Sequence, residues 1–249
     1  MNRFFTLLCC VVFTTLCSCQ FTETIYLNAD GSGKMEFMFD GGLLMQMAGE
    51  QMGDTQEQAI DSTFSFKDLF RTMQDSISKL PEEEQQKLKR LEPFNMHMVM
   101  NPETSEMRYD LFTDFKNVSD LQDMFKAIND ISNVTGNAQA SEANNPLSGL
   151  GADGNTSLDY NFDGKTFKRI AKVINREAYK QVTDSLEQMT MMFASSTYKL
   201  NYHFPKRIQS VSNENALISD DRKSITVEFG FMDYITDPEA LNLEVVLED

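Results

Sequence analysis

All four cysteines of this 249-residue chain lie within its first nineteen residues, at Cys9, Cys10, Cys17 and Cys19. The rest of the chain must therefore fold without disulfides and without thiolate metal sites. Its stability has to come from an apolar core, for which the length of the chain and its 41% of hydrophobic residues are sufficient. We predict no cofactor and no structural metal for this body.

The first nineteen residues follow the plan of an export signal. Arg3 precedes an apolar stretch from Phe4 to Leu16, which is shorter than the roughly 20 residues that cross a bilayer. Leu16-Cys17-Ser18-Cys19 resembles the bacterial lipobox, in which a small residue directly precedes the acylated cysteine. We expect residues 1–18 to be a lipoprotein signal peptide and Cys19 to carry the lipid. Cys17 is the competing position, and an ordinary secretion signal is the alternative.

Acylation at Cys19 would anchor the mature chain to a membrane without spanning it. Each buried methylene contributes about 0.8 kcal/mol, so two or more acyl chains hold a protein durably. No second apolar run of membrane length follows in the sequence. We therefore expect a lipid-anchored protein of the bacterial cell envelope, at the outer membrane, with the choice between its periplasmic and surface faces left open.

Residues 19–249 show hairpin and helix patterns that predict a single α+β domain with a mainly antiparallel sheet and several amphipathic helices on one face. Hairpins are expected at 22–39, around an Asn28-to-Gly33 turn, and at 94–115. Helices are expected at 43–52, 66–80, 81–93, 119–131 and after the N-cap Asn175. The remaining strands are expected at 157–162, 166–170, 197–204, 208–212, 225–232 and 241–247. Residues 133–156 are poor in large apolar side chains, which predicts a flexible loop.

The balance of 22 Lys plus Arg against 38 Asp plus Glu gives a net charge of −16, which disfavours nucleic acid as a partner. One segment departs from this acidity and carries Lys165, Lys168, Arg169, Lys172 and Arg176. It could form a basic face for an anionic lipid headgroup or an acidic glycan. The alternative is that these cations neutralise acidic neighbours inside the protein, such as Glu82 to Glu84.

Two short motifs resemble metal sites. Asn28, Asp30 and Ser32 have the spacing of an EF-hand loop, but Phe39 stands where the loop needs its final glutamate, so a hairpin turn is favoured. Met96, Met98 and Met100 share one face of an expected strand and could bind Cu(I), whereas the 16 methionines of the chain favour core filling.

The sequence contains no familiar catalytic set. It has two histidines, His97 and His203, and neither a Gly-x-Ser-x-Gly elbow nor a phosphate-binding glycine-lysine loop. His203 is expected at a strand end in a structural role. We therefore predict that the protein is not an enzyme.

The lipobox, the Asn28-to-Gly33 hairpin, and the tail from Phe204-Pro205 through Asp220-Asp221 to Pro238 together resemble envelope lipoproteins of Bacteroides-type bacteria. They are also similar to LppM-like lipoprotein domains, and this similarity implies a lipid-binding α+β fold. The expected function is that of a non-catalytic envelope lipoprotein that binds a lipid, glycan or protein partner at the membrane surface. A structural or assembly scaffold without a small ligand is the alternative.

Overall fold

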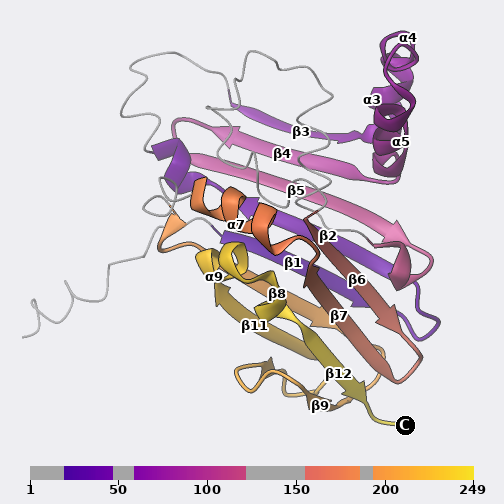
Figure 1. The fold of residues 1–249 in the computed structure, drawn as a ribbon, viewed down its shortest axis with the longest axis vertical. Helices are drawn as coiled ribbons and strands as arrows, with labels where there is room; N and C mark the ends of the chain where they lie inside the picture. The colour runs from indigo at the N-terminus through magenta and orange to yellow at the C-terminus, as the bar shows by residue number, and fades with distance from the viewer. Residues whose placement is uncertain (1–19, 47–58, 122–154, 186–192) are drawn as a thin grey trace, which may run out of the picture.

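The computed structural model describes residues 20–46, 59–121, 155–185 and 193–249, and its largest element is an eight-stranded sheet (Figure 1). The strand order is β10, β11, β8, β1, β2, β5, β4, β3. The strands are β1 (Gln20–Leu27), β2 (Gly33–Asp40), β3 (Ile60–Ser65), β4 (Asn95–Asn101), β5 (Glu106–Phe115), β8 (Thr197–His203), β10 (Leu217–Ile218) and β11 (Ser224–Gly230). The first strand therefore lies inside the sheet, between β2 and β8.

A second sheet has four strands, in the order β6 (Thr156–Phe162), β7 (Thr166–Val173), β12 (Leu243–Leu247) and β9 (Ile208–Val211). Its strands pair antiparallel, as do most pairs of the large sheet. β1 and β8 are the exception, because they pair in parallel from Gln20↔Thr197 to Tyr26↔His203. The α+β class is confirmed, but the expected one sheet is corrected to two, and the large sheet is mixed.

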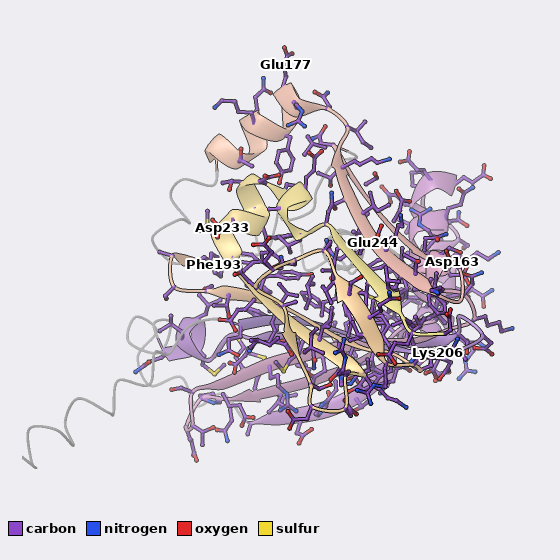
Figure 2. The ribbon with its side chains drawn as sticks, turned by 90° about the horizontal axis from the view of Figure 1, so that it is seen from below. Asp163, Glu177, Phe193, Lys206, Asp233 and Glu244 are labelled. Carbon is purple, nitrogen blue, oxygen red and sulfur yellow. The ribbon has the colours of Figure 1, made fainter. Side chains whose placement is uncertain are left out.

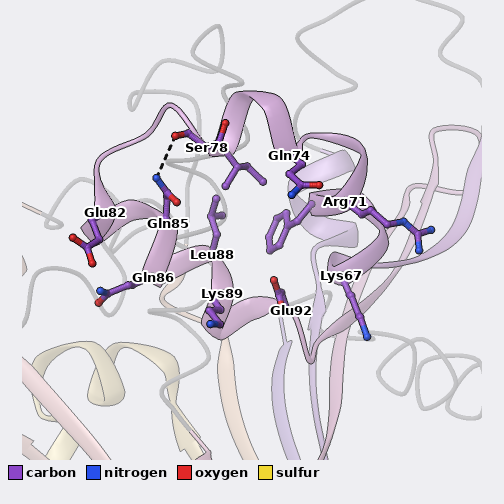
Figure 3. Close-up of a pocket in the computed structure, with 12 residues that line it drawn as sticks. Lys67, Arg71, Gln74, Ser78, Glu82, Gln85, Gln86, Leu88, Lys89 and Glu92 are labelled. Carbon is purple, nitrogen blue, oxygen red and sulfur yellow. Dashed lines mark hydrogen bonds between the residues drawn. The ribbon is translucent and has the colours of Figure 1, made fainter.

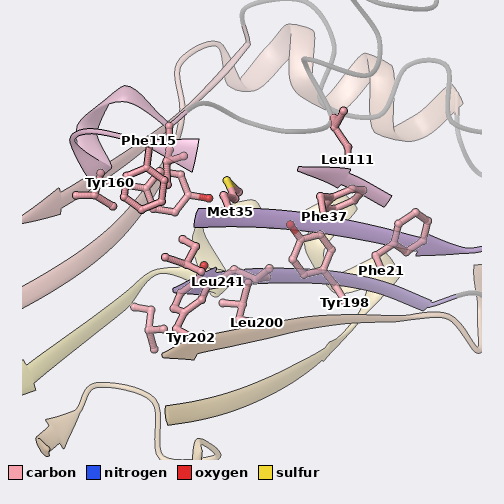
Figure 4. Close-up of a cluster of buried hydrophobic side chains, with 14 of the residues drawn as sticks. Phe21, Met35, Phe37, Leu111, Phe115, Tyr160, Tyr198, Leu200, Tyr202 and Leu241 are labelled. Atoms are coloured by element: carbon pink, nitrogen blue, oxygen red, sulfur yellow. The ribbon is translucent and has the colours of Figure 1, made fainter. Parts of the chain in front are cut away.

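The small sheet covers part of one face of the large sheet, and the two share a core (Figure 4). Side chains of the large sheet that point to this face and are at most 2% exposed include Phe21, Glu23 and Ile25 of β1 and Tyr198, Leu200 and Tyr202 of β8. From the small sheet, Phe167 packs edge-on against Tyr202, with ring centroids 5.3 Å apart. Strand alternation thus directs every second residue into the space between the layers.

The helices lie in two places, so the expectation that they all pack on one face is not confirmed (Figure 1). α3 (Phe66–Thr72), α4 (Gln74–Ile77) and α5 (Glu82–Leu91) connect β3 to β4 and stand at one end of the large sheet. α7 (Arg176–Ser185) and α9 (Phe231–Thr236) lie together on the face that the small sheet covers. There the Tyr179 hydroxyl donates to the Ile235 carbonyl at 2.6 Å, and Phe231 stacks on Phe21 at 4.1 Å.

Several local predictions are confirmed. The β1–β2 and β4–β5 hairpins form, and Gly31 at the first turn has φ +84°, a conformation that glycine adopts without strain. α5 follows Pro81, with three glutamates in its first turn and Lys89 and Arg90 in its last. Asn175 caps α7, because its side-chain oxygen accepts a hydrogen bond from the Ala178 N–H at 3.1 Å.

Other local predictions are corrected. The helix expected over residues 66–80 is interrupted at Met73, which ends α3 and begins α4. Residues 231–241, expected as strand and connection, form α9 and the 3₁₀ helix η3 (Pro238–Leu241). Asn117, and not Ser119, caps the short 3₁₀ helix η1 (Val118–Asp120), after which Leu121 is extended.

Some predictions fall outside the described residues. These are the signal peptide at 1–18, Cys19, the helix of 43–52 beyond residue 46, the helix of 119–131 beyond residue 121 and nearly all of the loop at 133–156. In the part of the chain that the structure describes, no helix has the length and apolarity to cross a membrane.

Candidate functional site

A surface groove of about 680 Å³ lies between α3 and α4 on one side and α5 on the other (Figure 3). Its apolar lining consists of Phe70, Ile77 and Leu88, of which Phe70 and Leu88 are buried and Ile77 is half-buried. The rest of the lining is polar and includes the cations Lys67, Arg71 and Lys89 and the carboxylates Glu82 and Glu92. The groove therefore has an apolar base and a charged rim.

A helix cap, a side-chain hydrogen bond and apolar packing hold the helices around this groove. Ser65 caps α3, and Phe66 and Phe70, four residues apart, are both buried on one helical face. The Gln85 side-chain amide donates to the Leu80 carbonyl at 2.8 Å, which ties α5 to the chain that leads into it. Leu88 is 2% exposed and completes the contact between the helices. The groove is thus a fixed space between packed elements.

The groove offers binding groups more than reactive ones. Arg71 pairs with Asp68 at 3.1 Å, but both side chains are more than 60% exposed, so this pair contributes little. Among the described residues, neither Lys67 nor Lys89 has an ion-pair partner. The one hydroxyl of the lining, on Ser78, donates to the Asp75 carbonyl at 3.1 Å and not to a general base.

A polar cluster that no local sequence pattern indicates is buried between the two sheets. Glu23 of β1, which is 1% exposed, accepts hydrogen bonds from Tyr160 and Tyr198 at 2.7 Å and from the Tyr202 hydroxyl. Arg169 of β7 is also 1% exposed, and its Nε lies 3.6 Å from the Glu23 carboxylate. The cluster therefore joins β1 and β8 of the large sheet to β6 and β7 of the small one.

The electrostatics of this cluster favour a fixed charge pair. Burial by itself would lower the pKa of Arg169, but the nearby Glu23 carboxylate raises it, and the net pKa is well above the usual value. Burial, and then the negative charge of Glu23, raise the pKa values of Tyr198 and Tyr202 well above 10.0. The tyrosines remain neutral donors and Arg169 remains a cation. We interpret the cluster as a structural link between the layers.

The basic segment, predicted as a contact for an anionic partner, is divided by strand alternation. The prediction that Arg169 contributes to a surface contact is wrong, because its side chain is buried and points inward to Glu23. Lys168 pairs with Glu244 at 2.7 Å, Arg176 with Glu239 at 3.3 Å, and Lys165 with Asp249. Lys172 is exposed and has no ion pair within the described residues.

These contacts agree with the alternative that the cations neutralise acidic neighbours, although the partners come from the C-terminal segment. Figure 2 labels Glu244, which lies on β12 and pairs with Lys168. Neutralising carboxylates reduce the attraction of the surface lysines for an anionic partner. Surface binding by Lys165, Lys168, Lys172 and Arg176 remains a hypothesis.

The two motifs that resemble metal sites, and His203, make contacts typical of structural residues. The Asp30 carboxylate accepts from both the backbone N–H and the hydroxyl of Ser32, as expected for a hairpin turn. Met100 pairs with Met107 across β4 and β5, and its sulfur accepts from Tyr109 at 3.6 Å. His203 ends β8 and stacks on Tyr26 at 4.5 Å. No group of three or more His, Cys, Asp or Glu side chains among the described residues could hold a metal ion.

Comparison with known proteins adds one distant structural neighbour. No protein-family model and no curated protein matches the chain. The folded domain of the LppM protein of Mycobacterium tuberculosis, solved by NMR, superposes with a TM-score of 0.35 and 7% sequence identity. The superposition covers 93% of this chain and 91% of that domain.

Proposed function

We propose that the protein is a non-catalytic lipoprotein of the bacterial cell envelope, attached to the outer membrane through Cys19. The observation that carries this proposal is the position of the lipobox. Leu16-Cys17-Ser18-Cys19 ends directly before Gln20, the first residue of β1. The apolar leader therefore gives way to the folded body at the residue expected to carry the lipid.

The groove of α3, α4 and α5 supports a binding role for this lipoprotein. Its apolar base could hold the hydrocarbon part of an amphiphile, while Lys67, Arg71 and Lys89 could meet an anionic group. We therefore favour an anionic amphiphile among the lipid, glycan and protein partners. The scaffold alternative is supported by the filled space between the sheets, where Tyr202 and Phe167 are both 0% exposed.

Attachment is tested by the Cys19→Ala variant in a bacterial host that acylates lipoproteins. We expect Cys19→Ala to abolish both lipid attachment, measured by palmitate labelling, and cleavage of the signal peptide, and we expect globomycin to block the cleavage. Cys17→Ala is the matched control and should leave both properties unchanged. Unaltered lipid attachment and cleavage in Cys19→Ala would contradict the proposed anchor.

Binding is tested by extracting the protein from its host and identifying bound species by native mass spectrometry. We expect a bound amphiphile that is lost from Ile77→Gln, because this change places an amide in the apolar base of the groove. Ser76→Gln, on an exposed position of the same helix, is the control. Co-purification with an envelope complex and no bound small molecule would favour the scaffold.

A further inference from the structure

The described chain begins inside the large sheet, directly after the expected lipid anchor. Cys19 is covalently joined to Gln20, the first residue of β1, and consecutive Cα atoms are about 3.8 Å apart. β1 is held by β2 on one side and by β8 on the other. An anchor at Cys19 would therefore have no linker through which the body could swing away from the membrane.

Strand register identifies what else lies at this end of the sheet. Gln20 is opposite both Asp40 and Thr197, and Asp40 is opposite Arg108. The β4–β5 turn around Glu103 extends beyond this level, since Asn101 pairs with Glu106. We call these strand ends, together with residues 41–46 after β2, the anchor-side end.

The anchor-side end combines apolar and acidic side chains. Ile60, at the start of β3, is 42% exposed, and Leu43 and Leu44, in the helical residues 42–46 after β2, are half-buried. The carboxylates include Glu103 and Glu106, both exposed. Acidic side chains are repelled by anionic headgroups, so this surface suits a bilayer rich in zwitterionic phospholipid.

The groove lies toward the opposite end. α3 begins directly after Ser65, which pairs with Asn95, whereas the Ile60↔Met100 pair lies nearer the anchor side. The eight residues of β1 span about 25 Å at about 3.3 Å per residue, and they end at the Asn28–Ser32 turn. Figure 1 shows the α3–α5 unit on the same side as this turn.

We propose that the anchor-side end rests on the zwitterionic headgroups of the membrane and that the α3–α5 groove opens toward the aqueous phase on the far side of the protein. This inference rests on the proposed lipid anchor at Cys19. It specifies one surface for the bilayer and another for the ligand. The groove would consequently receive its ligand from outside the leaflet that holds the anchor.

The test uses single cysteines as attachment points for a fluorophore, because the sequence after Cys19 contains no cysteine. Glu103→Cys labels the anchor-side turn, Ala29→Cys the opposite turn and Gln86→Cys the rim of the groove; all three positions are exposed. Each acylated, labelled protein is reconstituted into vesicles of phosphatidylethanolamine and phosphatidylcholine that contain a nitroxide-headgroup phosphatidylcholine as quencher.

We expect quenching at position 103 to be several-fold stronger than at positions 29 and 86. The same labelled, acylated proteins in vesicles without the nitroxide lipid give the unquenched reference at each position. Equal quenching at the three positions, or stronger quenching at 29 or 86, in protein that floats with the vesicles would overturn the proposed orientation while leaving the anchor intact. A protein that acquires no lipid and does not float would instead overturn the proposed function, and the orientation with it.

Discussion

Lys168 and Arg169 are neighbours in β7, yet they lie in opposite environments. Lys168 reaches Glu244 on the surface, where the two side chains are 43% and 46% exposed. Arg169 faces Glu23 between the sheets, where both are 1% exposed. Water can therefore reach and replace the Lys168–Glu244 contact, whereas it is excluded from the Arg169–Glu23 contact. A cation on a strand acquires its role from the face to which alternation assigns it.

The interior pair should show the largest effect on stability. Glu23→Gln keeps an oxygen that can accept from the tyrosine hydroxyls but leaves Arg169 without its counter-charge. We expect the free energy of unfolding to fall by about 3–5 kcal/mol, because an unpaired buried charge is strongly destabilising. Urea unfolding of the purified protein, followed by circular dichroism, measures this loss.

A double variant separates the charge from the packing. Glu23→Gln combined with Arg169→Met removes both charges, and we expect most of the stability lost in Glu23→Gln to return. If the double variant were less stable than Glu23→Gln, Arg169 would contribute mainly through packing and its hydrogen bond to the Leu241 carbonyl.

His97 represents an environment between these extremes. Its side chain is 27% exposed and lies 2.9 Å from Asp61 and 3.2 Å from Asp110, which also accepts from Arg108. The hydrogen bond to Asp61 is the main cause that raises the pKa of His97 above 6.5. A raised pKa in the folded state stabilises the protein below the unfolded value, and this stabilisation is lost as pH rises through the folded value.

We therefore expect His97→Gln to destabilise the protein more at about pH 5.5 than at about pH 8.5. The measurement is the difference in unfolding free energy between the variant and the unaltered protein at each pH. Asn95→Gln, on the same strand, serves as the control for general strand effects. A difference that is the same at both pH values would show that the protonated histidine contributes nothing.

The surface pair should show the smallest effect. We expect Lys168→Gln to change the free energy of unfolding by no more than about 1 kcal/mol, because exposed ion pairs gain little and are screened by salt. The same denaturation measurement in low and high salt checks this. A loss comparable to that of Glu23→Gln would show that exposure does not separate the two pairs.

The elements predicted best from the sequence are those that depend on nearby residues. The turn at Gly31, the Pro81 start of α5 and the Asn175 cap of α7 are each determined within a few positions. The division into two sheets and the parallel pairing of β1 with β8 depend on contacts between distant segments, which leave no local pattern. Burial of Arg169 was missed for the same reason, since its partner Glu23 belongs to the first strand.

The candidate site was less predictable than the fold. The spacing of apolar residues over 66–80 predicts one continuous helix. The interruption at Met73 turns the chain between α3 and α4, and α5 closes the other side of the groove. The spacing of apolar residues predicts which face of a helix is buried, but not whether its neighbour covers that face completely.

The position of β1 also determines how the protein would respond to a pull. A tether at Cys19 would transmit tension straight into a strand bonded along both edges, to β2 and to β8. Drawing that strand out would require two ladders to shear together, and Glu23 would have to leave its arginine and tyrosines as they broke. An anchor joined to β1 would therefore not be pulled out of the folded body easily.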